Sequence, residues 1–187
     1  VYKNVAKICA FGYCICDEEF HILEKEDLLI NPNGKFHLTD RGGDGIVLPY
    51  DYADFKKYPD FKAYYAKIKS LLEGEDKLVL GHAAINDVKY LSLETRRYKL
   101  PSFSFRFADT QVMYMAMTET YDRQAGLEAL TQIFEIEYTA HCAADDAYAT
   151  MRVAQKMCER EGCTLSQLLE KYSIRPGKIE NNQFSGC

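Results

Sequence analysis

The stretch from Leu78 to Leu91, LVLGHAAINDVKYL, decides the fold. Its first residues are apolar and form a run short enough for a buried strand. Ile85, Val88 and Leu91 then recur at the spacing of one helical face. A buried strand that leads directly into a helix is typical of an α/β protein. Asp87 falls on the first turn of this helix, so we expect its side chain at the helix edge that faces the sheet.

Similar alternation continues along the chain. Apolar runs and turn residues predict strands at 7–16, 20–24, 27–30 and 105–109. Apolar residues at helical spacing predict helices at 61–72, 110–115, 126–134, 144–160 and 165–172. Strands followed by alternating helices and strands predict one α/β domain, a mixed sheet flanked by helices, over residues 1–160. Residues 161–187 are interpreted as a C-terminal helix and tail.

Composition narrows the possible partners. The formal net charge is −5, which excludes a broad basic surface for nucleic acid but leaves room for a small cleft. Since no apolar run reaches the roughly 18 residues of a membrane span, no membrane partner is expected. The seven cysteines form no Cys-x-x-Cys pair, which favours reduced thiols and a cytoplasmic location. The oligomeric state stays open.

Two histidine–aspartate pairs share one spacing. His82 lies five residues before Asp87, and His141 lies five before Asp146. Both aspartates are expected in the first turn of a helix, where the helix dipole favours a negative charge. The spacing alone therefore leaves two interpretations open, a functional site or two ordinary N-terminal acids.

The order of several short motifs resembles the DEDDh (DnaQ-like, proofreading-type) 3′→5′ exonucleases. LVLGH through Asp87 is similar to their second motif, and the pair His141 and Asp146 is similar to their third. Asp109-Thr110, the GLEAL segment at 126–130 and the LLINP segment at 28–32 also resemble the family, in its order, over residues 5–160. This resemblance implies an RNase H-like fold and the hydrolysis of phosphodiester bonds from a 3′ end.

The resemblance also implies roles for single residues. In this family four carboxylates hold two Mg²⁺ or Mn²⁺ ions, and a histidine acts as general base on the attacking water. Asp87 and Asp146 would be two of the metal ligands, and His141 would be the base. The implied partner is the 3′ end of a single-stranded DNA or RNA. The basic residues nearest this site, Arg96, Arg97 and Lys99, are either nucleic-acid contacts or a solvated helix end.

One family motif is absent, the Asp-x-Glu that carries the other two carboxylates on a central first strand. Because the 7–16 strand corresponds to the second strand of the family, we expect this motif upstream of Val1. Asp17-Glu18-Glu19 is interpreted as a solvated hairpin turn and not as a substitute. The missing carboxylates leave an alternative function, a catalytically inactive RNase H-like interaction module. A third interpretation, a zinc site at His82, His141 and Cys142, lacks the ligand spacing of known zinc sites.

Overall fold

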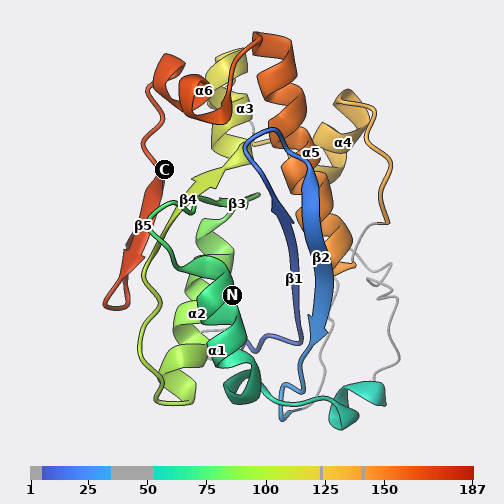
Figure 1. Ribbon diagram of the computed structural model, residues 1–187, viewed down its shortest axis with the longest axis vertical. Helices are drawn as coiled ribbons and strands as arrows, with labels where there is room; N and C mark the ends of the chain where they lie inside the picture. Colours follow the sequence, from blue (N-terminus) through green and yellow to red (C-terminus); the bar gives the residue numbers. More distant parts are fainter. Residues whose placement is uncertain (1–5, 35–52, 123, 140–141) are drawn as a thin grey trace.

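The structure of the chain, a computed structural model, describes residues 6–34, 53–122, 124–139 and 142–187 (Figure 1). Its strands lie in two sheets with helices packed against them. In the described residues no helix combines the length and apolar character needed to cross a bilayer. All seven cysteines lie in these ranges, and none of them forms a disulfide.

The N-terminal sheet is a hairpin of β1 (Ala10–Cys16) and β2 (Ile22–Leu29), paired antiparallel. The turn predicted at residues 17–19 is confirmed. The sequence predicted two strands, 20–24 and 27–30, where the structure has the single strand β2. That prediction was wrong because Lys25 and Glu26 stay paired with Cys14 and Tyr13, so the ladder continues through the polar residues.

The second sheet has the order β3-β4-β5-β6. Strands β3 (Val79–Gly81) and β4 (Phe105–Asp109) pair in parallel, whereas β5 (Gly177–Glu180) and β6 (Gln183–Ser185) continue the sheet antiparallel. The sequence predicted no strand after residue 172. The chain ends in these two short strands instead, and Ile179 is completely buried against the core.

The helices agree with those predicted from the apolar spacing. They are α1 (Phe61–Leu72), α2 (Ile85–Arg97), α3 (Thr110–Thr118), α4 (Leu127–Ile133), α5 (Ala143–Glu161) and α6 (Leu165–Lys171), with a 3-10 helix at Asp54–Lys57. One apolar cluster joins α1 and α2 to β1, β2, β4 and β5, and a second joins α3, α4, α5 and α6 to β4. Strand β4 serves both clusters because its side chains alternate, with Phe105 and Phe107 in the first and Ala108 in the second.

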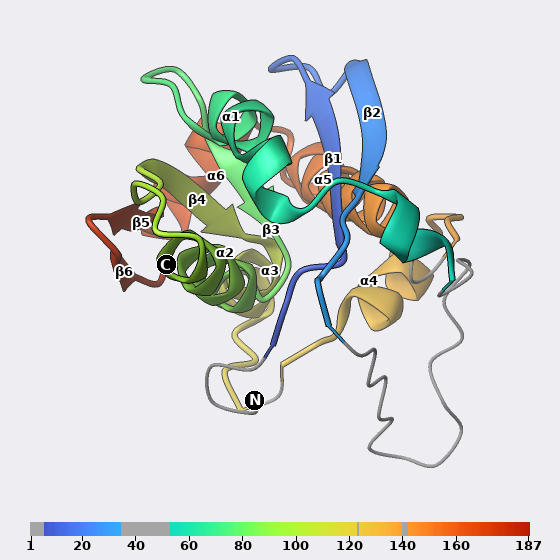
Figure 2. The same cartoon turned by 90° about the horizontal axis from the view of Figure 1, so that it is seen from below.

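The two sheets do not join. Among the described residues, β1 has β2 as its only strand neighbour, and β3 has only β4. Figures 1 and 2 show the β1–β2 pair set apart from β3, β4 and β5, while α5 packs against both β1 and β3. The central strand that the family resemblance places between them is not among the described residues.

Candidate active site

Asp109 ends β4 and holds the turn between β3 and α2. Its Oδ1 accepts hydrogen bonds from the backbone N–H of Ala83 (3.0 Å) and Gln111 (2.9 Å), and its Oδ2 accepts one from Ala84 (2.8 Å). The side chain is buried. Ala83 has a positive φ of 53°, and the two charge-assisted hydrogen bonds from Ala83 and Ala84 offset the strain of this turn. The bond from Gln111 caps the start of α3. Asp109 therefore fixes where α2 begins.

Asp87 lies in the first turn of α2, as predicted, and is exposed to solvent. Although the residue as a whole is exposed, desolvation of its carboxyl by the surrounding protein, and then the charge of Asp109, raise its pKa to about 6. Both effects disfavour the ionised carboxylate. A cation bound beside Asp87 would instead stabilise the ionised carboxylate.

His82 has a structural role. Its Nδ1 lies 3.0 Å from Thr110 Oγ1, and its Nε2 lies 3.0 Å from the carbonyl oxygen of Ala125. Burial lowers the pKa of this imidazole. Since both ring nitrogens are engaged, His82 cannot offer one to zinc without losing a hydrogen bond. The zinc interpretation is therefore not supported, although His141 lies outside the described residues.

The first turn of α5 carries Asp145 and Asp146. Asp145 forms an ion pair with Lys25 of β2, and this hydrogen bond lowers the pKa of the carboxyl. Asp145 is thus an acid of the first helical turn that is paired within the protein. Asp146 is half-buried, and its backbone N–H donates to the carbonyl oxygen of Cys142 (2.8 Å), which makes it part of the opening helical turn.

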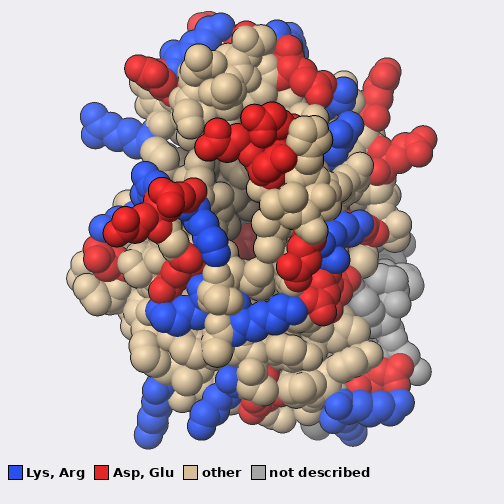
Figure 3. Space-filling view, viewed as in Figure 1, with Lys and Arg blue, Asp and Glu red and all other residues tan. Residues whose placement is uncertain are grey.

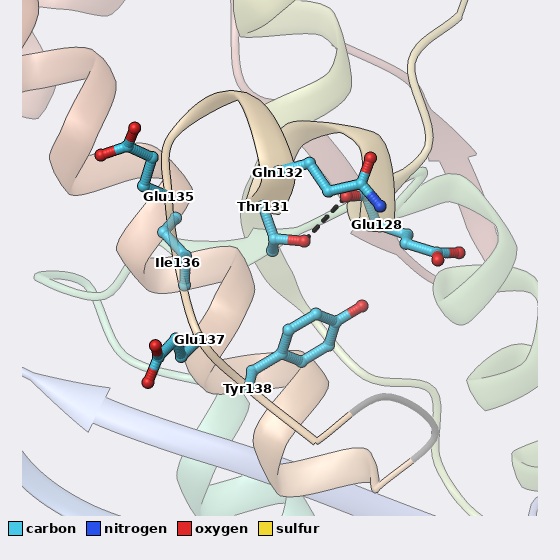
Figure 4. Close-up of a pocket in the computed structure, with 7 residues that line it drawn as sticks. All are labelled: Glu128, Thr131, Gln132, Glu135, Ile136, Glu137 and Tyr138. Carbon is cyan, nitrogen blue, oxygen red and sulfur yellow. Dashed lines mark hydrogen bonds between the residues drawn. The ribbon is translucent and has the colours of Figure 1, made fainter.

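A pocket of about 510 Å³ lies between α4 and the segment that leads to the first turn of α5 (Figure 4). Three glutamates line it together with Thr131, Gln132, Ile136 and Tyr138. Figure 4 shows the Tyr138 ring pointing toward Thr131 and Glu128. Burial, followed by the charges of Asp146 and Glu128, raises the pKa of Tyr138. This acidic lining is unsuited to a phosphate group.

The basic residues at the end of α2 are engaged within the protein. Arg97 pairs with the buried carboxylate of Glu94 and donates to the carbonyl oxygen of Ala6 (2.8 Å). Arg96 donates to the carbonyl oxygen of Asn182 (3.2 Å). Their guanidinium groups therefore tie the two ends of the chain to α2, which does not favour the predicted role in nucleic-acid binding.

The face seen in Figure 3 is hollowed near its middle, between the positions of β3 and β1 in Figure 1. Acidic and basic side chains both occur around this hollow. Among the described residues, one group of potential metal ligands is close enough to share an ion: Asp17, Glu19 and His21 at the hairpin turn. Asp17 Oδ1 accepts hydrogen bonds from the backbone N–H groups of Glu19 and His21. These bonds form the hairpin turn, which explains why the three side chains lie close together.

Two interactions that the sequence did not reveal bear on this site. Asp27 of β2 accepts hydrogen bonds from the start of α5, and the charge of Asp146 contributes to the raised pKa of Tyr138. The only sequence signal for Asp27 was an acid beside the apolar run Leu28 to Ile30.

Comparison with known proteins identifies the class of the fold first. The structure matches that of a 3′-exonuclease described as "3'-end specific recognition of histone mRNA stem-loop by 3'-exonuclease" with a TM-score of 0.73 at 13% identity, over 100% of this chain and 83% of the other. A structure of "full-length 3'-exonuclease" matches with a TM-score of 0.73 at 14% identity, over 100% and 83% of the two chains. Exonuclease X in complex with 5′ overhanging duplex DNA matches with a TM-score of 0.56 at 15% identity, over 88% and 90%. The fold is therefore the RNase H-like fold of these exonucleases.

The family follows from the sequence match. The family model "DEDDh_C: DNA polymerase III subunit epsilon-like, C-terminal domain" matches residues 56–157, more than half of the chain. The chain belongs to this DEDDh exonuclease family, which confirms the resemblance found in the motifs. No curated protein sequence matches it. The matched range includes Asp87, His141 and Asp146.

Proposed function

We propose that this chain is a metal-dependent 3′→5′ exonuclease that acts on the 3′ ends of single-stranded DNA or RNA. Asp87 and Asp146 are proposed as ligands of Mg²⁺ or Mn²⁺ in a two-metal site, and His141 as the general base. The observation that carries the proposal is the family match, because its range includes all three residues in the spacing of the family motifs.

The donor chemistry at α2 suits a hard cation. Carboxylate oxygens are the ligands that Mg²⁺ and Mn²⁺ prefer, and Asp87 lies where its ionised form is destabilised. Asp109 is not proposed as a ligand, because both of its oxygens already accept backbone hydrogen bonds. The ions would stabilise the charge that develops on the attacking and leaving oxygens.

The protein residues would divide the remaining work. Asp87 and Asp146, each on the first turn of a helix, would hold the cations and through them the scissile phosphate. A neutral imidazole at His141 would accept the proton of the attacking water, since the ordinary pKa of histidine is near 6.5. The net charge of −5 favours a short single-stranded end over a long duplex as substrate.

A second candidate function is a catalytically inactive interaction module. It is favoured by the edges of β1 and β3, which pair with no further strand among the described residues. A module of this kind would bind a partner without hydrolysing nucleic acid.

Release of mononucleotides from a 3′-labelled single-stranded oligonucleotide separates the two functions. With Mg²⁺ or Mn²⁺ we expect release by the protein expressed from its full reading frame, and none after His141→Ala. The melting temperature of the variant, measured beside that of the parent, separates loss of the base from loss of the fold. Absence of release by the full-length protein with either metal would favour the interaction module.

Thermal melts with and without Mg²⁺ test the metal ligands separately. We expect Mg²⁺ to raise the melting temperature of the parent and to have a smaller effect on Asp87→Asn and Asp146→Asn. Asp76→Asn is the matched control, because it removes an exposed carboxylate from the turn before β3. If Asp87→Asn and Asp146→Asn respond to Mg²⁺ as strongly as the control does, the assignment of these ligands is wrong.

A further inference from the structure

The longest of the described helices, α5, begins without a side-chain cap from its own N-cap residue. Cys142 occupies the N-cap position of α5, and its side chain makes no capping hydrogen bond. Serine, threonine, aspartate or asparagine would normally accept a hydrogen bond from the first turn at this position. An acceptor from another part of the chain can satisfy these N–H groups instead.

Asp27 supplies that acceptor from β2. Its Oδ1 accepts a hydrogen bond from the backbone N–H of Ala144 (2.7 Å), and its Oδ2 accepts one from the Cys142 thiol (3.0 Å). The residue is separated from α5 by more than 100 positions in sequence. A carboxylate at a helix N-terminus also interacts favourably with the helix dipole. Both interactions fix the start of α5 against the sheet.

Gly12 lets α5 approach closely enough for these bonds. It pairs with Asp27 across the hairpin, and a Cβ built on it would lie 1.9 Å from the carbonyl carbon of Ala143. No side chain fits there unless α5 moves. Lys25, two residues before Asp27, adds the ion pair with Asp145 and lies 5.0 Å from the centre of the Tyr148 ring. Strand residues two apart share one face, so this face of the hairpin contacts the first turns of α5.

We propose that Asp27 is a positioning residue that sets the location of the Asp146 carboxylate, and that Gly12 is the matching contact that allows it. The proposal rests on the proposed function, because Asp146 is there a metal ligand. Asp27 is not proposed as a metal ligand. It acts through Cys142, whose carbonyl oxygen accepts the hydrogen bond of the Asp146 N–H, and through Ala144, two residues before Asp146.

Positioning predicts an effect on metal affinity that ordinary destabilisation would not produce. Residues that orient a metal ligand typically change affinity by 10–100-fold. Because Asp27 acts one step away from Asp146, we expect Asp27→Ala to raise the Mn²⁺ concentration at half saturation by about 10-fold. Gly12→Ala should act in the same direction without a change of charge. Asp27→Asn keeps an oxygen for the Ala144 N–H and should restore most of the affinity.

Thr164→Ala is the matched control. Thr164 caps α6 through a capping box with Gln167, far from α5's first turn in sequence. Thr164→Ala removes a helix cap, as Asp27→Ala does, but Thr164 itself contacts neither Asp87 nor Asp146. We expect Thr164→Ala to lower the melting temperature and leave the Mn²⁺ affinity unchanged.

The experiment uses two measurements on the full chain. Mn²⁺ is titrated while the broadening of the amide NMR signals is recorded, and hydrogen exchange of the backbone amides is measured separately. In Asp27→Ala the amides of residues 144–146 should exchange faster than in the parent, while those in the centre of α5 keep their protection. Unchanged exchange at residue 144 would overturn the proposal, and so would equal Mn²⁺ affinity in Asp27→Ala and the control. Failure of the parent to bind Mn²⁺ would contradict the proposed function instead, because the exchange result does not depend on metal.

Discussion

Replacement of Asp109 should cost more stability than any other change at the β3–α2 turn. Asp109→Ala removes three hydrogen bonds of 2.8–3.0 Å from a side chain that is 6% exposed. Each hydrogen bond to a charged group contributes about 1.5–3 kcal/mol net. Removal of a buried charge recovers part of its desolvation cost. We therefore expect a loss of about 4 kcal/mol in the free energy of unfolding, near the lower end of the summed values.

Asp109→Asn tests the roles of the two carboxylate oxygens separately. The amide oxygen can still accept from Ala83 and Gln111, but the amide NH₂ then faces the Ala84 N–H, where donor meets donor. One lost bond and one unsatisfied buried donor should cost about 2–3 kcal/mol. Both variants should also lower the pKa of Asp87, because the Asp109 charge is one of the two causes that raise it.

Urea denaturation of the metal-free protein measures these losses. For a chain of this size, 1 kcal/mol corresponds to about 2–4 °C in melting temperature, so Asp109→Ala should melt about 8–16 °C below the parent. Asp76→Asn, at an exposed carboxylate, should stay within about 0.5 kcal/mol of the parent. If Asp109→Ala also stays within that margin, the β3–α2 turn and the start of α3 do not depend on these three hydrogen bonds, and the placement of Asp87 needs another explanation.

Three further outcomes follow from contacts elsewhere in the structure. Arg97→Met should cost about 3–5 kcal/mol in urea denaturation, because it leaves the Glu94 carboxylate, 2% exposed, without its guanidinium partner; the double variant with Glu94→Gln should be more stable than Arg97→Met alone. Gly177→Ala should cost about 1–3 kcal/mol, since its Cβ would lie 2.4 Å from Phe107 Cζ, whereas Gly126→Ala, with nothing within 4 Å, should be tolerated; equal losses would contradict the packing. The pKa of His82 is lowered in the folded state, so below about pH 6.5 the folded state binds fewer protons than the unfolded state. The free energy of unfolding should therefore be highest above that pH and fall as the pH drops through it. His82→Gln should flatten this pH dependence.

The sequence predicted those parts of the fold that depend on local patterns. Apolar residues at helical spacing correctly predicted the six α-helices found in the described part of the chain, because each helix buries one face. The β5–β6 strands were missed because residues 177–185 are mostly polar and are held by pairing with β4, a contact made across about 70 residues of sequence. The single strand β2 was read as two because Lys25 and Glu26 interrupt its apolar pattern, although their partners keep them extended.

Site residues were predictable only where the signal is local. Asp87 follows a strand on the first turn of a helix, and both features are visible in the sequence. The capping of α5 by Asp27 depends on a hairpin that folds back onto a helix far along the chain, so no local pattern encodes it. Arg97 looked like a surface cation at a helix end, and only the structure reveals that its carboxylate partner, Glu94, is buried.

The hydrogen bonds that each carboxylate accepts distinguish the aspartates that hold the fold together from the one proposed to bind a metal. The carboxylates of Asp109 and Asp27 accept hydrogen bonds from the starts of α2 and α5, so their charges are offset within the protein. The charge of Asp87 is not offset in this way: desolvation and Asp109 raise its pKa to about 6. A carboxylate that the fold leaves destabilised gains most from an added cation. For this reason we propose Asp87, and not the better-bonded Asp109 beside it, as the metal ligand.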